Sequence, residues 1–176
     1  MRTRPERRPT PATRAATALA LAAALLAAAG AQAHGDSHPP RSAPAAGPPD
    51  DTQHDWGRAG DPRRVQRTVE LAMDDRMRFV PALLRVRLGE TLRLRVRNQG
   101  ALLHELVIGT ESELDAHAEL MRRHPGMEHD APYMAHVAPR RQGEIVWHFN
   151  RRGQFHFGCL LPGHWEAGMR GRIHVE

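Results

Sequence analysis

Apolar and polar residues alternate with a period of two along much of the chain beyond residue 64. The stretch from Thr91 to Arg97 is the clearest case, with leucine and valine on one face and arginine on the other. Such alternation predicts half-buried β-strands, and Gly, Pro and Asn separate successive runs. The predicted strands span 65–72, 77–80, 83–88, 91–97, 102–108, 143–149, 153–159 and 170–175. Many short strands with turns between them indicate an all-β sandwich or barrel.

The segment 111–124 has the features of a helix instead. Glutamate and aspartate crowd its first turn, while Arg122, Arg123 and His124 occupy its last turn. These charges complement the helix dipole, and Pro125 with Gly126 stops the helix. One helix is therefore expected as an insertion among the strands, followed by a polar loop.

The N-terminus has the pattern of an export signal. Residues 1–33 combine five arginines, an Ala/Leu-rich run over 15–29 and the small-residue cleavage pattern Ala31-Gln32-Ala33. The apolar run is shorter than the ~20 residues that span a bilayer, so we expect cleavage and a periplasmic protein without a membrane anchor. Residues 34–62 are rich in Pro, Gly and Ala and predict a flexible tail, which leaves 63–176 as the folded domain.

The charge of the chain adds little to this picture. The formal net charge is +5, but residues 1–33 contribute +4 of it, so the remainder carries only +1. No nucleic-acid partner is inferred from such a balance. The single cysteine, Cys159, cannot form an internal disulfide, and a lone thiol in an oxidising compartment needs protection, which a bound metal would provide.

A candidate metal-binding motif surrounds that cysteine. Four residues separate Cys159 from His164, and four more separate His164 from Met169. A thiolate, an imidazole and a thioether form a soft ligand set, and a second histidine would complete the ligands of a blue copper site. His104 is the favoured upstream histidine because it follows a turn in an apolar context. His148 and His156 are the alternatives, although both fall inside predicted strands.

These motifs carry a resemblance to a known family. Asn98-x-Gly100 before His104, the aromatic strand that ends at Cys159, and the loop from Pro162 to Met169 together resemble the cupredoxins of the plastocyanin/azurin type. The resemblance implies a Greek-key β-sandwich and a type 1 copper cofactor. His104, Cys159 and His164 would be equatorial ligands and Met169 the axial one. Many cupredoxins have an Asn after this histidine, and it supports the ligands from outside the coordination sphere. In this chain Glu105 takes that position.

The arrangement is most similar to periplasmic cupredoxins associated with copper tolerance, which share a histidine-bearing tail and a Met/His-rich insertion. Thioethers and imidazoles suit Cu(I), so this insertion is a candidate second copper site. The alternative is that its methionine packs on the sandwich and its histidines are solvated. The candidate ligands are His117, Met121, His124, Met127, His129 and Met134, with His136 close behind them.

These motifs are compatible with three functions to different degrees. The first is a one-electron carrier, and the second is a copper-tolerance protein that sequesters or delivers copper. The third, a copper enzyme, is disfavoured because Gly158 and Leu160 flank Cys159, where such enzymes usually place a histidine. The expected partner is a redox protein or a copper-handling protein in the periplasm.

Overall fold

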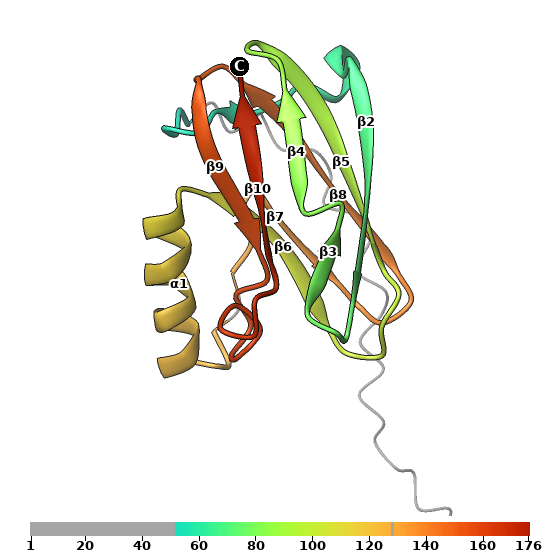
Figure 1. Cartoon of the computed structure of the whole chain (residues 1–176), viewed down its shortest axis with the longest axis vertical. Coiled ribbons are helices and arrows are strands. Elements are labelled where there is room, and N and C mark those ends of the chain that lie inside the picture. The colour runs from blue at the N-terminus through green and yellow to red at the C-terminus, as the bar shows by residue number, and fades with distance from the viewer. Residues whose placement is uncertain (1–51, 128) are drawn as a thin grey trace, which may run out of the picture. The chain divides into compact units, whose positions relative to one another are not determined.

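The computed structural model describes residues 52–127 and 129–176, which form a sandwich of two five-stranded β-sheets with one α-helix beside it (Figure 1). The first sheet has the order β1-β8-β5-β2-β3 and the second β4-β10-β9-β6-β7. The first comprises β1 (Arg58–Ala59), β2 (Arg67–Asp74), β3 (Arg78–Val80), β5 (Glu90–Asn98) and β8 (Gln142–Phe149). The second comprises β4 (Leu83–Val86), β6 (His104–Gly109), β7 (Met134–Val137), β9 (Gly153–Gly158) and β10 (Arg170–Val175). The predicted Greek-key β-sandwich with one inserted helix is confirmed.

The alternation that predicted β5 places its apolar residues in the core. Leu92, Leu94 and Val96 are fully buried, whereas the arginines between them face outward. β5 runs parallel to β2 and antiparallel to β8, so it forms the centre of its sheet. Burying each such side chain contributes about 1.5–3 kcal/mol, which makes this strand a main source of stability.

β6 and β9 bring the candidate ligands to one end of the second sheet. They pair antiparallel, with Val107 opposite Gly158. β6 begins at His104 rather than at the predicted residue 102, because the Asn98 side chain holds the preceding loop. Its amide donates to the carbonyls of Leu102 and Val137, at 2.7 Å and 2.9 Å, and its oxygen accepts from the N–H of Gly100. His104 thus occupies the first position of a buried strand.

Helix α1 (Glu111–Arg123) has a clear start and a clear end. Thr110 and Glu113 form a capping box in which each side chain accepts a hydrogen bond from the other's backbone N–H. The helix buries Leu114, Ala118 and Met121 and packs against β6 and β9. It ends one residue before the predicted boundary, because His124 has the non-helical angles φ −132° and ψ 67°.

Three short elements were not predicted. β7 lies just after the polar loop and pairs antiparallel with β6. The other two lie in the predicted tail, where β1 pairs with β8 and a 3-10 turn η1 (Pro62–Arg64) follows. In the same segment Trp56 is 2% exposed and belongs to the core. The expectation of a flexible tail up to residue 62 is therefore corrected for 52–62, because Trp56 stacks on Trp147 with ring centroids 4.6 Å apart.

The predicted signal segment 1–33 and the tail positions 34–51, with His34 and His38, lie outside the described residues. Among the helices that the structure does describe, none is long and apolar enough to cross a membrane.

Candidate metal centre

The loop between β9 and β10 closes back on itself and brings its ends together. The N–H of Cys159 donates to the carbonyl of Met169 at 3.0 Å, and the N–H of Met169 donates to the carbonyl of His164 at 3.0 Å. Gly163 has φ +84°, a left-handed conformation that glycine adopts without strain, and the chain turns at Pro162 and Gly163. Cys159 and Met169 are both fully buried at the base of this loop.

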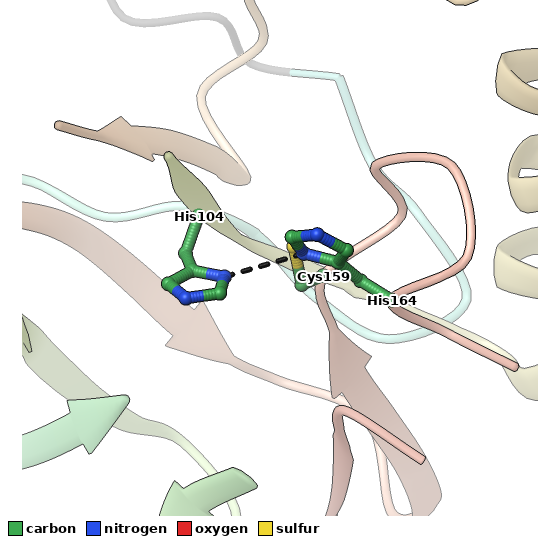
Figure 2. A group of neighbouring side chains, drawn as sticks. All are labelled: His104, Cys159 and His164. Carbon is green, nitrogen blue, oxygen red and sulfur yellow. Dashed lines mark hydrogen bonds between the residues drawn. The ribbon is translucent and has the colours of Figure 1, made fainter. Parts of the chain in front are cut away.

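Three candidate ligands converge at this point, as Figure 2 shows. Nδ1 of His164 lies 3.2 Å from Sγ of Cys159 and 3.2 Å from Nδ1 of His104. Within the part of the chain that the structure describes, these residues form the one group of three His, Cys, Asp or Glu side chains whose ligand atoms all lie within 4.8 Å of one another. The choice of His104 over His148 and His156 agrees with this geometry. His148 instead meets the Thr91 hydroxyl at 3.0 Å.

Asp75 orients the His104 ring from the turn between β2 and β3. Its Oδ1 lies 3.0 Å from Nε2 of His104, and the carboxylate also accepts from the N–H groups of Ala101 and Leu102. These backbone hydrogen bonds and His104 lower the pKa of Asp75, so it is a carboxylate at neutral pH. A carboxylate acceptor places the proton of His104 on Nε2 and leaves the Nδ1 lone pair facing His164 and Cys159.

The Cys159 sulfur is buried and hydrogen-bonded. Burial, and next the nearby Glu105 carboxylate, raise the pKa of the thiol to about 12. The backbone N–H of Glu105 points at Sγ, with N and S 3.4 Å apart. Burial and the neighbouring His104 lower the pKa of His164, so its imidazole is neutral and able to bind a metal at pH 7. Without metal the thiol stays protonated, and a metal that binds here must displace that proton.

Glu105 fills the position where many cupredoxins have Asn. Its side chain is fully buried, and Oε1 accepts a hydrogen bond from the N–H of Leu160 at 2.7 Å. This bond ties β6 to the residue after Cys159, so the carboxylate fastens the ligand loop. Oε2 lies 3.0 Å from Nε2 of His136, the residue opposite Glu105 on the neighbouring strand β7.

The donor atoms fit copper. A thiolate and two imidazole nitrogens, with a thioether on the same buried loop, form the soft, mixed sulfur–nitrogen set of a type 1 site. The ligand atoms of the three side chains already lie within 4.8 Å of one another. Hydrogen bonds fix two of these side chains, His104 through Asp75 and Cys159 through the N–H of Glu105. Copper held here would exchange one electron between Cu(I) and Cu(II).

The structure separates the predicted second-site residues into two groups. His117 on α1 faces His129, with ring centroids 4.6 Å apart, and the ring centroids of His129 and His136 are 6.3 Å apart. Met121 and Met134 are buried, whereas His124 and Met127 are exposed. The residues that sequence reasoning missed are Asp75, whose acidic turn carries no motif, and His136 as the neighbour of Glu105.

Comparisons with known proteins agree with this geometry. Residues 65–176 match the model of the family described as copper binding proteins, plastocyanin/azurin family. The chain is 48% identical over 126 residues to the copper-resistant cuproprotein CopI of Rubrivivax gelatinosus, covering 72% of this chain and 76% of the relative. It is 27% identical over 150 residues to the protein of the same name in Pseudomonas aeruginosa, covering 69% and 82%.

Solved structures share the fold. Auracyanin B superposes with a TM-score of 0.57 at 21% identity, covering 68% of this chain and 96% of that one. An auracyanin from Roseiflexus castenholzii gives a TM-score of 0.55 at 20% identity, covering 64% and 98%. With the family match over 65–176 and the convergence of His104, Cys159 and His164, the chain belongs to the plastocyanin/azurin family of copper-binding proteins.

Proposed function

We propose that this protein is a periplasmic one-electron carrier whose type 1 copper serves copper tolerance. The observation that carries the proposal is the preformed ligand set, in which one thiol sulfur and two imidazole nitrogens lie within 4.8 Å of one another. Electron transfer favours a centre that hardly moves between its two oxidation states. Asp75 and the backbone of the β9–β10 loop hold the ligands in place, which limits such movement.

The surroundings of the centre offer one side for contact with a partner. His104 is fully buried, whereas His164 is partly exposed and lies beside the exposed Pro162 and Gly163. Leu102 and Leu103, which precede His104, are 47% and 46% exposed. An apolar surface around the exposed ligand suits brief docking of a redox protein, and His164 is then the exit for the electron.

Copper tolerance and the periplasmic location rest on two further supports. The relatives at 48% and 27% identity are named copper-resistant cuproproteins, and residues 1–33 have the pattern of an export signal. Export also accounts for the solitary cysteine, because a metal-bound thiolate is protected in an oxidising compartment. A carrier role, rather than enzyme catalysis, is consistent with Gly158 and Leu160 flanking Cys159.

The direct test is the absorption spectrum of the copper-loaded protein. We expect an intense visible band from charge transfer between the Cys159 thiolate and Cu(II), with reversible bleaching by a reduced cytochrome. Cys159→Ser should abolish the band. His156→Ala, which removes a β9 histidine outside the ligand group, should leave it intact. A Cys159→Ser protein that kept the band would refute the assignment.

The second candidate is a copper-sequestering or copper-delivery protein. The observation that favours it is the gathering of His117, His129 and His136 outside the first centre. The two functions separate in a strain that lacks the protein and is challenged with copper. Rescue by wild type but not by Cys159→Ser supports the carrier function. Rescue that depends on these histidines and not on Cys159 supports sequestration.

A further inference from the structure

His129 is half-buried, and its ring nitrogens stand in an environment that a polar ring seldom tolerates. Both of its ring nitrogens are inaccessible to solvent, and neither has a hydrogen-bond partner. A buried polar atom without a partner costs about 1–3 kcal/mol, and native structures leave few of them. A metal ion is one of the partners that removes this cost, because it binds the lone pair of a neutral imidazole.

The neighbours of His129 are two further imidazoles from separate elements. The ring centroid of His117, on α1, lies 4.6 Å away, and that of His136, on β7, lies 6.3 Å away. Two imidazoles that bind one metal at about 2.0–2.1 Å have ring centroids roughly 4.5–6.5 Å apart, depending on the angle at the metal. Both spacings fall in that range. The copper-site pair in the same chain, His104 and His164, has centroids 5.0 Å apart.

A buried carboxylate borders the same cluster. Glu105 faces His136 directly across the β6–β7 pair, and its buried Oε2 lies 3.0 Å from Nε2 of His136. Asp130 adds a second carboxylate at the rim, 3.6 Å from the other ring nitrogen of His136. The cluster therefore combines three imidazoles with two carboxylates.

We propose that His117, His129 and His136, with the Glu105 carboxylate, form a second metal site that binds a divalent ion, Cu(II) before Zn(II). Imidazole nitrogen and carboxylate oxygen suit these ions, and among divalent metals such sites bind Cu(II) most tightly. This ligand set differs from the thioether site that the methionines suggested, since Met134 packs in an apolar cluster with Leu114 and Trp165.

The side chains must rotate to close around the ion. Among the described residues outside the first centre, no three His, Cys, Asp or Glu side chains yet bring one ligand atom each within 4.8 Å of one another. His129 lies in the loop between α1 and β7 rather than in a strand or helix, so its ring can move toward His117 and His136.

The experiment measures copper per chain in the exported protein. His34 and His38 are replaced by Ala throughout, which removes the imidazoles of the tail. After loading with Cu(II) and gel filtration, we expect two copper ions per chain. One gives the thiolate band, and the other gives an axial electron paramagnetic resonance spectrum with nitrogen splitting. His117→Ala and His129→Ala should each lose the second ion and keep the thiolate band at full intensity.

His124→Ala is the matched control, because His124 is exposed at the end of the same helix, and it should retain both ions. The proposal is overturned if the protein with only His34 and His38 replaced holds only the thiolate-bound ion, or if the His117→Ala and His129→Ala proteins still hold two. It is also overturned if only a variant with Met121, Met127 and Met134 replaced by Leu loses the second ion.

A second measurement covers the case in which a variant does not fold. The protein with only His34 and His38 replaced is loaded with one equivalent of Cu(I), which is diamagnetic and suits the thiolate site, so the second site stays open. Zn(II) is then added, and the side-chain nitrogen resonances of the histidines are followed by NMR. Those of His117, His129 and His136 should shift together, and unchanged resonances overturn the site. This inference stands apart from the proposed function: loss of electron transfer leaves the second ion in place, and loss of the second ion leaves the thiolate band.

Discussion

Asp75 provides the sharpest test of how the copper centre is held. Asp75→Ala removes the acceptor that faces Nε2 of His104 at 3.0 Å, together with the acceptor for two backbone N–H groups of the β5–β6 loop. His104 is then free to change tautomer and to turn. Loss of such an orienting partner typically weakens metal binding about 10–100-fold, and we expect Cu(II) affinity to fall by that factor.

Asp75→Asn separates geometry from charge. The amide oxygen still accepts from Nε2, so we expect the loss of Cu(II) affinity to be about tenfold, at the low end of that range. Cu(I) carries one charge less and should lose less affinity. Each tenfold fall in the ratio of Cu(II) affinity to Cu(I) affinity raises the one-electron reduction potential by about 59 mV. Competition with a chelator gives the affinities, and voltammetry gives the potential.

Asp74→Asn is the control, because this neighbouring carboxylate pairs with Arg76 at 2.7 Å on the surface of the same turn. Gly100→Ala offers an independent route to the same effect, since a Cβ at residue 100 would overlap the Asp75 carboxylate. If Asp75→Ala bound Cu(II) as tightly as wild type and kept its potential, the orienting role of Asp75 would be wrong.

Three further predictions concern the fold and the thiol. Arg67 lowers the pKa of Glu90, so the stability from this pair is full above pH 4.5 and is lost as the pH falls through the lowered value. Glu90→Gln should therefore cost about 1–3 kcal/mol at pH 7 in urea unfolding and much less at pH 3, and an equal cost at both would contradict the ion pair. Trp56→Ala should cost about 3–5 kcal/mol by the same assay, whereas a cost below about 1 kcal/mol would place Trp56 outside the core. The metal-free thiol, fully buried and with its pKa raised to about 12, should resist iodoacetamide at pH 8 until urea unfolds the chain, and rapid labelling of the folded protein would refute that burial.

The strands and the ligand loop were predictable because their determinants are local. Alternation marks β5 over nearly its whole length, and the spacing of Cys159, His164 and Met169 specifies a loop chemistry before any fold is known. His104 was predictable for a related reason. It follows a turn in an apolar context, although the predicted strand 102–108 placed it inside a strand rather than at the first position of β6.

The parts that escaped prediction depend on contacts between distant segments. Nothing near Asp75 shows that its turn lies at the same end of the sandwich as His104. Trp56 lies in a Pro- and Gly-rich stretch, and only its stacking on Trp147 orders that segment. The partnership of Glu105 with His136 depends on the register of β6 against β7, a strand with too short a pattern to predict.

In the insertion the helix was predicted almost correctly, but the second-site residues predicted from it do not all come together. The spacing of His117, Met121 and His124 puts them on one helical face only if the helix continues through His124. It ends at Arg123, so His124 turns to solvent and Met121 is buried. The imidazoles that gather around His117 come instead from the following loop and from β7, beyond the reach of helical periodicity.

The strands at the four edges of the two sheets are all short. In the described fold, β1 has 2 residues, β3 has 3, and β4 and β7 have 4 each, whereas the inner strands have 6 to 9. Unpaired backbone N–H and C=O groups along a sheet edge are the template on which other chains add strands and aggregate. Short edges present few such groups, so this sandwich offers little template for the addition of strands from other chains.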